Sequence, residues 1–174
     1  MERFKIYNRR YLGSKYKLLE FIEKIVEENT ENSKLFLDLF AGTGVVADYF
    51  NKKYDVVLND LLKCNYFSYE CFFSNLEYDE KKLIKIMKKY NKKIVEDNNY
   101  YSENFKDTYL NEKNLKKVGF IRDDIDDLFE KKEINKREKA ILITSLIYAV
   151  DRIANTVGHY DAYRKNGDLE NSSN

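Results

Sequence analysis

Apolar positions in the first part of the chain follow helical and strand-like patterns in turn. Residues 18–26 place apolar side chains every three or four positions with acidic residues between them, which predicts an amphipathic helix. Residues 35–40 (LFLDLF) and 54–58 (YDVVL) are short, mostly apolar runs typical of buried parallel strands. Helical spacing follows each run, at residues 45–50 and 64–73. This order predicts an α/β fold with a doubly wound parallel sheet.

The remainder of the chain is predicted to be mainly helical. Residues 79–97 pattern as one helix with an apolar face and a lysine-rich face, and residues 98–112 are polar and Tyr-rich, which favours a loop. Residues 113–132 and 138–155 predict two more helices, the second apolar almost all round and therefore buried. Residues 165–174 lack periodicity and are predicted to be disordered.

Composition narrows the classes of protein that fit. The 31 basic and 30 acidic residues exclude a globally basic nucleic-acid binder but leave local patches open. No apolar run approaches a membrane span and the start has no secretory segment, so we expect no membrane partner and a cytoplasmic location. Cys64 and Cys71 suit one helix face better than a metal site, and we expect no metal. His159, the only histidine, has no evident catalytic partner.

Candidate chemistry gathers where the two predicted strands end. Asp38 precedes Gly42 and Gly44, and Asp60 ends the next strand, where an acidic residue can bind ribose hydroxyls. A plain strand–turn–helix connection is the simpler alternative. The spacing of Gly42, Gly44 and Ala47 also fits the dinucleotide fingerprint, which keeps a nicotinamide or flavin enzyme open. Asp38 would repel a pyrophosphate but attract an ammonium group, which favours S-adenosylmethionine.

A basic segment lies upstream, at residues 8–17. Its Gly13-Ser14-Lys15 is superficially similar to the end of a P-loop, but the earlier glycine and the preceding strand are missing, which argues against ATP binding. The simpler interpretation of this segment is a solvated basic arm.

Four stretches together carry a family resemblance. RRYLGSKYKLL, LFLDLFAGTGVVADYF and VVLNDLLKCNYFSY occur in this order, and LITSLIYAVDRIANTVGHYDAY spans residues 142–163. The first resembles R-Y-[IL]-G-[SG]-K-x-x-L, the second D-x-F-x-G-x-G, and the third a strand ending in N-D before an aromatic helix. These motifs resemble the Dam-like adenine-specific DNA methyltransferases, a group that includes type II modification enzymes.

The resemblance implies roles for individual residues. Tyr11 would pack on S-adenosylmethionine, Asp38 would bind the methionine ammonium, and Asp60 would bind the ribose hydroxyls or the adenine edge. The full set of implied cofactor-binding residues is Tyr11, Lys15, Asp38, Phe40, Gly42, Gly44 and Asp60. The residues expected to contact double-stranded DNA are Arg9, Arg10, Lys15, Lys85 and Lys89. The lysine-rich face of residues 79–97 would follow DNA phosphates, and its simpler alternative is a solubilising helix face.

The resemblance also implies an architecture. We expect a Rossmann-like methyltransferase core that is incomplete at its carboxyl side and carries a mainly helical insert. Residues 1–75 would form the cofactor-binding core and residues 76–139 the target-recognition insert. A buried helix at 140–164 would return to the core, and a disordered tail would cover 165–174.

One family motif is missing from the chain. The family stacks the flipped adenine on a [DNS]-P-P-[YF] motif, and this chain contains no proline, so no catalytic residue is assigned. We therefore expect a truncated, frameshifted or split methyltransferase that is inactive without a second polypeptide carrying the motif. The alternatives are a non-catalytic cofactor- or DNA-binding remnant and a nicotinamide-dependent oxidoreductase.

Overall fold

The computed structural model describes residue 6 and residues 13–106, 108–156 and 162. The chain divides into two units, residues 1–73 and 74–174, which are described separately below. Arg9, Arg10, Tyr11 and His159 lie outside the described residues, as does the predicted tail at 165–174. In the described part, no helix has the length and apolar character needed to cross a membrane.

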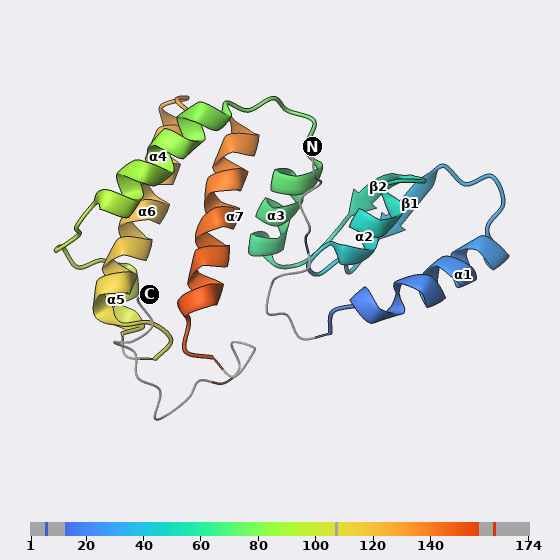
Figure 1. Ribbon diagram of the computed structural model, residues 1–174, viewed down its shortest axis with the longest axis horizontal. Coiled ribbons are helices and arrows are strands. Elements are labelled where there is room, and N and C mark those ends of the chain that lie inside the picture. Colours follow the sequence, from blue (N-terminus) through green and yellow to red (C-terminus); the bar gives the residue numbers. More distant parts are fainter. Residues whose placement is uncertain (1–5, 7–12, 107, 157–161, 163–174) are drawn as a thin grey trace. The chain divides into compact units, whose positions relative to one another are not determined.

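The first unit has the predicted order of helices and strands (Figure 1). A short 3-10 helix, η2, leads into α1, and two strands then alternate with two further helices. The bounds are Tyr16–Leu18 for η2, Leu19–Asn29 for α1, Leu35–Asp38 for β1, Val45–Phe50 for α2, Asp55–Leu58 for β2 and Lys63–Phe73 for α3. The α/β class is confirmed, and β1 and β2 form a two-stranded parallel sheet. A larger doubly wound sheet stays a prediction.

The two strands are covered on one face within their own unit. Phe36 and Val56 pair in register and point into a core with α1 and α2, in which Phe36 stacks on Phe50 with ring centroids 4.4 Å apart. Alternate side chains of a strand point to opposite faces, so Leu35, Leu37 and Val57 lie on the other face, where they are exposed. The prediction of strands buried on both faces is therefore wrong for these elements of the first unit.

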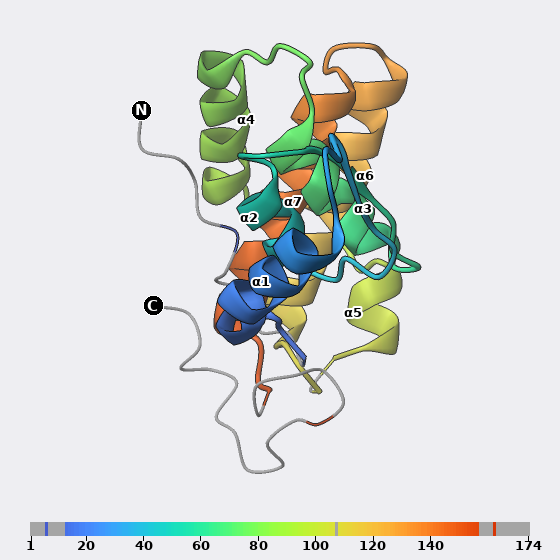
Figure 2. The ribbon, with the colours of Figure 1, turned by 90° about the vertical axis from the view of Figure 1, so that its right-hand side faces the viewer.

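The second unit is helical within its described residues (Figures 1 and 2). Its helices are α4 (Glu80–Lys92), α5 (Tyr100–Asn104), α6 (Glu112–Glu130) and α7 (Lys136–Ile153). The predictions for α6 and α7 are confirmed within two residues at each end. Two details are wrong: α4 ends at Lys92 rather than at residue 97, and α5 occupies the segment predicted as a loop.

Each helix of the second unit begins at an Asn or Asp residue whose side chain accepts hydrogen bonds from the first turn. These caps are Asp79, Asn99, Asn111 and Asn135. The caps of α5 and α7 are reciprocal capping boxes, with Ser102 and Glu138 as the returning residues. Such caps satisfy N–H groups that a helix leaves without partners, which fixes where each helix starts.

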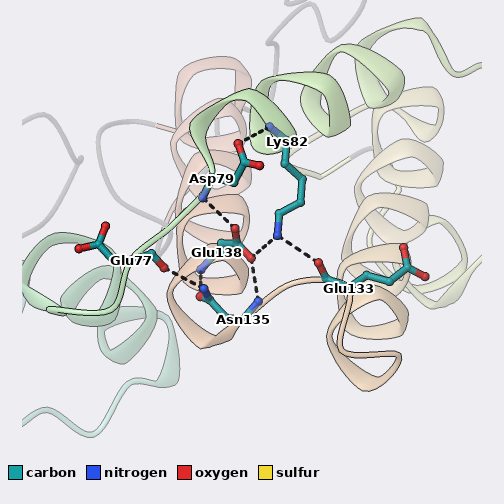
Figure 3. A network of polar contacts seen from close by, with 6 residues as sticks. All are labelled: Glu77, Asp79, Lys82, Glu133, Asn135 and Glu138. Atoms are coloured by element: carbon teal, nitrogen blue, oxygen red, sulfur yellow. Dashed lines mark hydrogen bonds and ion pairs between the residues drawn. The ribbon is translucent and has the colours of Figure 1, made fainter.

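A polar network fastens the segment before α4 to the start of α7 (Figure 3). Glu138 is only 2% exposed, and its carboxylate accepts hydrogen bonds from Lys82 Nζ at 2.7 Å and from the backbone N–H groups of Asp79 and Asn135. Lys82 Nζ also donates to the carbonyl oxygen of Glu133 at 3.1 Å. The network accounts for a carboxylate in the interior, because a buried charge persists only when it is paired and hydrogen-bonded.

Candidate cofactor-binding site

Hydrogen bonds also connect the segments that directly follow β1 and β2. The backbone N–H of Asn59 donates to the carbonyl oxygen of Asp38 at 2.9 Å, and the N–H of Ala41 donates to the carbonyl oxygen of Asn59 at 3.0 Å. The side-chain amide of Asn59 donates to the carbonyl oxygen of Leu39 at 2.9 Å. The segments that follow the two strands therefore lie against each other at the carboxyl edge of the sheet, where ligands of parallel sheets bind.

The turn after β1 depends on two glycines with positive φ. Gly42 has φ of 53° and Gly44 has φ of 83°, a region that other residues rarely adopt. A Cβ atom at Gly44 would also lie 3.3 Å from Cε1 of Tyr69 and 3.5 Å from the ring of Phe73. The backbone conformation and the packing both require glycine at position 44, so this turn has one well-defined shape.

Asp60 connects this glycine turn to the segment after β2. One carboxylate oxygen accepts the N–H of Gly42 at 2.9 Å, and the other accepts the N–H of Leu62 at 2.8 Å and the amide of Asn65 at 3.0 Å. Burial alone would raise the pKa of this carboxyl, but these three donors outweigh it and hold the pKa below its ordinary value. Asp60 is therefore ionised and fixed in orientation near neutral pH.

Asp38 stands at the end of β1 in a different electrostatic setting. Burial raises the pKa of its carboxyl, and the negative charge of Asp60 raises it further, against the N–H of Phe40 and the positive charge of Lys15. The predicted pair of acids is thus brought together at one sheet edge. Asp38 is the member whose charge a bound cation would stabilise most.

Two exposed apolar residues follow these acids closely in the chain. Phe40 is 90% exposed and Leu61 is 98% exposed, and each lies within two residues of an acid, Asp38 or Asp60. Lys15 is exposed and donates from Nζ to the carbonyl oxygen of Gly13 at 2.8 Å. The sequence motifs pointed to Phe40 and Lys15. Leu61 was not singled out, although its place next to Asp60 was a signal.

Sequence reasoning also missed two residues of α3. Asn65 donates to Asp60, and the hydroxyl of Tyr69 donates to the carbonyl oxygen of Gly42 at 2.6 Å. Both side chains are buried. They are four residues apart and so share a helix face, and this spacing behind an acidic strand end was the available signal.

The lysines predicted to contact DNA differ in their surroundings. Lys89 lies 3.5 Å from Asp124 of α6, whereas Lys85 is exposed and forms no ion pair with another described residue. Lys81, Lys88 and Lys92 are likewise exposed and have no ion pair within the described part of the chain. Because helical spacings of three and four residues return to one face, these four lysines form a row along α4, here called the lysine row.

The acidic cluster of α6 faces basic side chains. Asp124 pairs with Lys89, and Asp126 pairs with Lys139 at 2.7 Å and with Arg122. These two acids are therefore engaged by basic side chains of the same unit. Their charge is thereby partly neutralised inside the second unit.

Comparison with known protein families identifies the family to which the chain belongs. Residues 11–174 match the D12 class N6 adenine-specific DNA methyltransferases, and the chain belongs to this family. It is 35% identical over 171 residues to the modification methylase LlaI of Lactococcus lactis subsp. lactis and 38% identical over 175 residues to the modification methylase StsI of Streptococcus sanguinis. The resemblance inferred from the sequence motifs is confirmed. No solved structure gave a significant match.

The relatives are much longer than the matched region. The alignments cover 90% and 91% of this chain but only 27% and 26% of these two methylases. For the type II methyltransferase M.NlaIII of Neisseria lactamica, 26% identical over 164 residues, the alignment covers 49% of the relative. The chain therefore spans between a quarter and a half of the length of these relatives.

Proposed function

We propose that this chain is the S-adenosylmethionine-binding and DNA-recognition part of an adenine-specific DNA methyltransferase of a restriction–modification system, acting in the cytoplasm. The reaction is methyl transfer to the exocyclic amino group of adenine in double-stranded DNA. The observation that carries the proposal is the placement of Asp38 and Asp60 on either side of the glycine turn, at the carboxyl ends of adjacent parallel strands. Family membership favours this function over a nicotinamide-dependent oxidoreductase.

The described residues suit the chemical groups of this cofactor. The Asp38 carboxylate would pair with the methionine ammonium, since burial raises its pKa and a cation restores the charged form. Asp60 would accept from ribose hydroxyls or the adenine edge with the lone pair left on the oxygen that bonds Gly42. The exposed ring of Phe40 would cover apolar surface of the cofactor.

The chain's residues would act by binding and orientation. When bound, S-adenosylmethionine would supply an activated methyl group, carried on a positively charged sulfur, to the adenine amino nitrogen. Gly42 and Gly44 let the backbone approach the cofactor, and Asp38 with Asp60 fixes both of its ends. Lys15 would lie between the cofactor and the DNA target. Holding the reactants in place is the main source of catalysis for such a transfer.

The helical unit would supply contacts to DNA. The lysine row runs from Lys81 to Lys92 of α4, eleven steps of about 1.5 Å each or about 16 Å in all, which is long enough to follow several phosphates. We therefore assign phosphate contact to Lys81, Lys85, Lys88 and Lys92, with Lys85 as the member that the sequence also indicated. Lys89 is a weaker candidate because Asp124 already lies beside it.

The proposal keeps the division of the chain into a core, an insert, a returning helix and a tail. It also includes the expectation that methyl transfer requires a further protein region. This chain has no proline and hence no [DNS]-P-P-[YF] motif. The groups that hold the target amino nitrogen would come from a region outside the 174 residues, on the same or a second polypeptide. We expect the purified chain alone to transfer no radiolabelled methyl groups to DNA, and methyl transfer by it would refute this part of the proposal.

Calorimetric titration with S-adenosylmethionine tests cofactor binding directly. We expect the chain to bind this ligand but not NAD, and we expect Asp38→Asn to weaken binding by at least tenfold. The matched control is Asp55→Asn, which removes an exposed carboxylate at the opposite end of β2. Binding of NAD without S-adenosylmethionine, or an equal decrease in affinity in both variants, would contradict the assignment.

A further inference from the structure

Helix α3 holds both sides of the candidate cofactor site through two buried side chains. Asn65 is fully buried and donates from Nδ2 to Asp60 Oδ1 at 3.0 Å. One turn further along the same face, the buried hydroxyl of Tyr69 donates to the carbonyl oxygen of Gly42 at 2.6 Å. The acid after β2 and the glycine turn after β1 are therefore both tied to one rigid helix.

Both backbone polar groups of Gly42 are hydrogen-bonded to side chains. Its N–H donates to Asp60 Oδ2 at 2.9 Å, while its carbonyl oxygen accepts from Tyr69. Both polar groups of this residue are thus fixed by side chains that follow β2. Since Gly42 has no Cβ and has φ of 53°, its own conformation restrains it weakly, and the restraint must come from these partners.

The ring of Tyr69 makes a second contact with the turn. It packs against Gly44, where an added Cβ would lie 3.3 Å from its Cε1 atom. The ring and the hydroxyl therefore act on different glycines, the ring on Gly44 and the hydroxyl on Gly42. A change to phenylalanine removes the hydrogen bond to Gly42 and keeps the packing on Gly44.

We propose that Asn65 and Tyr69 are positioning residues for the cofactor. Asn65 sets the orientation of the Asp60 carboxylate, and Tyr69 sets the orientation of the Gly42 peptide group, so that both meet the cofactor in a preformed geometry. Neither side chain needs to touch the cofactor itself. This inference rests on the proposed function, because it assigns roles within the same S-adenosylmethionine site.

These hydrogen bonds would raise cofactor affinity because they order the binding groups before the cofactor arrives. A carboxylate without its Asn65 donor can rotate away from Gly42, and a carbonyl without its Tyr69 donor can turn with its peptide plane. Each binding event would then have to restore the geometry, and the ordering would reduce affinity. One hydrogen bond contributes about 0.5–1.5 kcal/mol, which corresponds to an affinity change of about two- to tenfold.

The test compares S-adenosylmethionine affinity by calorimetry in Tyr69→Phe and Asn65→Leu, with unfolding followed by circular dichroism. We expect each variant to bind about three- to tenfold more weakly while remaining folded at the titration temperature. The matched control is Tyr54→Phe, because Tyr54 packs in the core of the same unit and its hydroxyl has no described hydrogen-bond partner. We expect the control to bind like the wild type.

A double-mutant cycle separates positioning from a general structural effect. If Asn65 acts by orienting the Asp60 carboxylate, Asn65→Leu will cost less affinity in an Asp60→Ala background, which has no carboxylate to orient, than in the wild type. Equal costs in both backgrounds would overturn the role of Asn65. Wild-type affinity in Tyr69→Phe would overturn the role of Tyr69, and this conservative variant decides the matter even where Asn65→Leu fails to fold. A wild-type chain that binds no S-adenosylmethionine would refute the proposed function, and this inference with it.

Discussion

Asn99 lies directly over Gly119, so close that a Cβ atom on the glycine would stand 2.3 Å from the Asn99 side-chain carbon Cγ. The amide of Asn99 donates to the carbonyl oxygen of Lys116 at 2.8 Å, and its oxygen caps the first turn of α5. The missing side chain at Gly119 thus leaves room for the residue that joins the N-terminus of α5 to the middle of α6.

This contact predicts that Gly119→Ala destabilises the chain. In an exposed helix interior the change would stabilise by about 1 kcal/mol through helix propensity. Here the added methyl group displaces Asn99 and its hydrogen bonds, so we expect the free energy of unfolding to fall by about 1–3 kcal/mol. Urea unfolding followed by circular dichroism measures this decrease, and amide hydrogen exchange in α5 and α6 locates it.

The control for this prediction is the same change in an Asn99→Ala background. With the Asn99 side chain gone, the clash disappears and Gly119→Ala is expected to become neutral or stabilising. If the alanine costs the same in both backgrounds, the contact with Asn99 is not the cause.

The network around Glu138 predicts an acid-sensitive second unit. Glu138→Gln keeps the shape of the side chain but removes the charge that Lys82 and two backbone N–H groups stabilise. Because Lys82 is partly exposed, we expect a destabilisation of about 1–3 kcal/mol rather than the larger cost of breaking a fully buried pair. Glu112→Gln, which removes a more exposed partner of Lys116, is expected to cost much less, because solvent screens an exposed ion pair.

The same residue gives the dependence on pH a definite sign. Burial raises the pKa of Glu138, but Lys82 and the backbone donors outweigh it, so that the pKa lies below the ordinary value of 4.5. A carboxyl with a lowered pKa contributes its full stability above pH 4.5 and loses it as the pH falls through the folded-state pKa. Denaturant unfolding between about pH 7 and pH 3 should therefore show a shallower decline in Glu138→Gln than in the wild type. Parallel declines in the two proteins would count against the network.

Asp38 predicts that cofactor binding weakens as the pH falls through the raised pKa of its carboxyl. Its pKa is raised by burial and by Asp60, whereas the pKa of Asp60 is lowered, so Asp60 stays ionised while Asp38 takes up a proton. Only the ionised form of Asp38 attracts an ammonium group, and affinity should fall up to about tenfold per pH unit below its pKa. Calorimetry across the pH range gives the midpoint of this decline.

Two variants identify the titrating group. Asp38→Asn should bind weakly and with little dependence on pH. Lys15→Met removes a positive charge that lowers the pKa of Asp38, so the midpoint should move to higher pH. A midpoint that stays in place in Lys15→Met, or a pH dependence that survives in Asp38→Asn, would show that another group is responsible.

The sequence was informative where local pattern and chemistry coincide. Two apolar runs, each followed by a turn or an Asn-Asp pair, predicted β1 and β2 and the acids at their ends. Helix α5 was missed because the capping box of Asn99 uses Ser102 in place of the usual Glu or Gln, in a segment that is otherwise polar. The pattern of apolar and polar residues therefore predicts regular helices and strands, but it does not reveal a short helix that begins with an unusual capping box.

Contacts between residues far apart in the chain could not be predicted from the sequence pattern. The bond from Tyr69 to Gly42 joins residues 27 apart, and the bond from Lys82 to Glu138 joins residues 56 apart. A helical wheel places Lys82, Lys85 and Lys89 near one another, but which of them is neutralised depends on the packing of α6 and α7 against α4. Which of these lysines pairs with an acid among the described residues is accordingly a result of tertiary structure.

The lysine row predicts a measurable salt dependence of DNA binding. Removing one phosphate contact should reduce the slope of log affinity against log salt by about 0.9, so the double variant Lys85→Gln and Lys88→Gln should reduce it by about two. Fluorescence anisotropy with a double-stranded oligonucleotide at several salt concentrations measures the slope. The matched control, Lys34→Gln with Lys52→Gln, removes the same charge from exposed sites in the first unit that form no ion pair with another described residue. Equal reductions in both double variants would mean that net charge, rather than this row, governs binding. Lys89→Gln should reduce the slope less than Lys85→Gln does, because Asp124 already offsets the charge of Lys89.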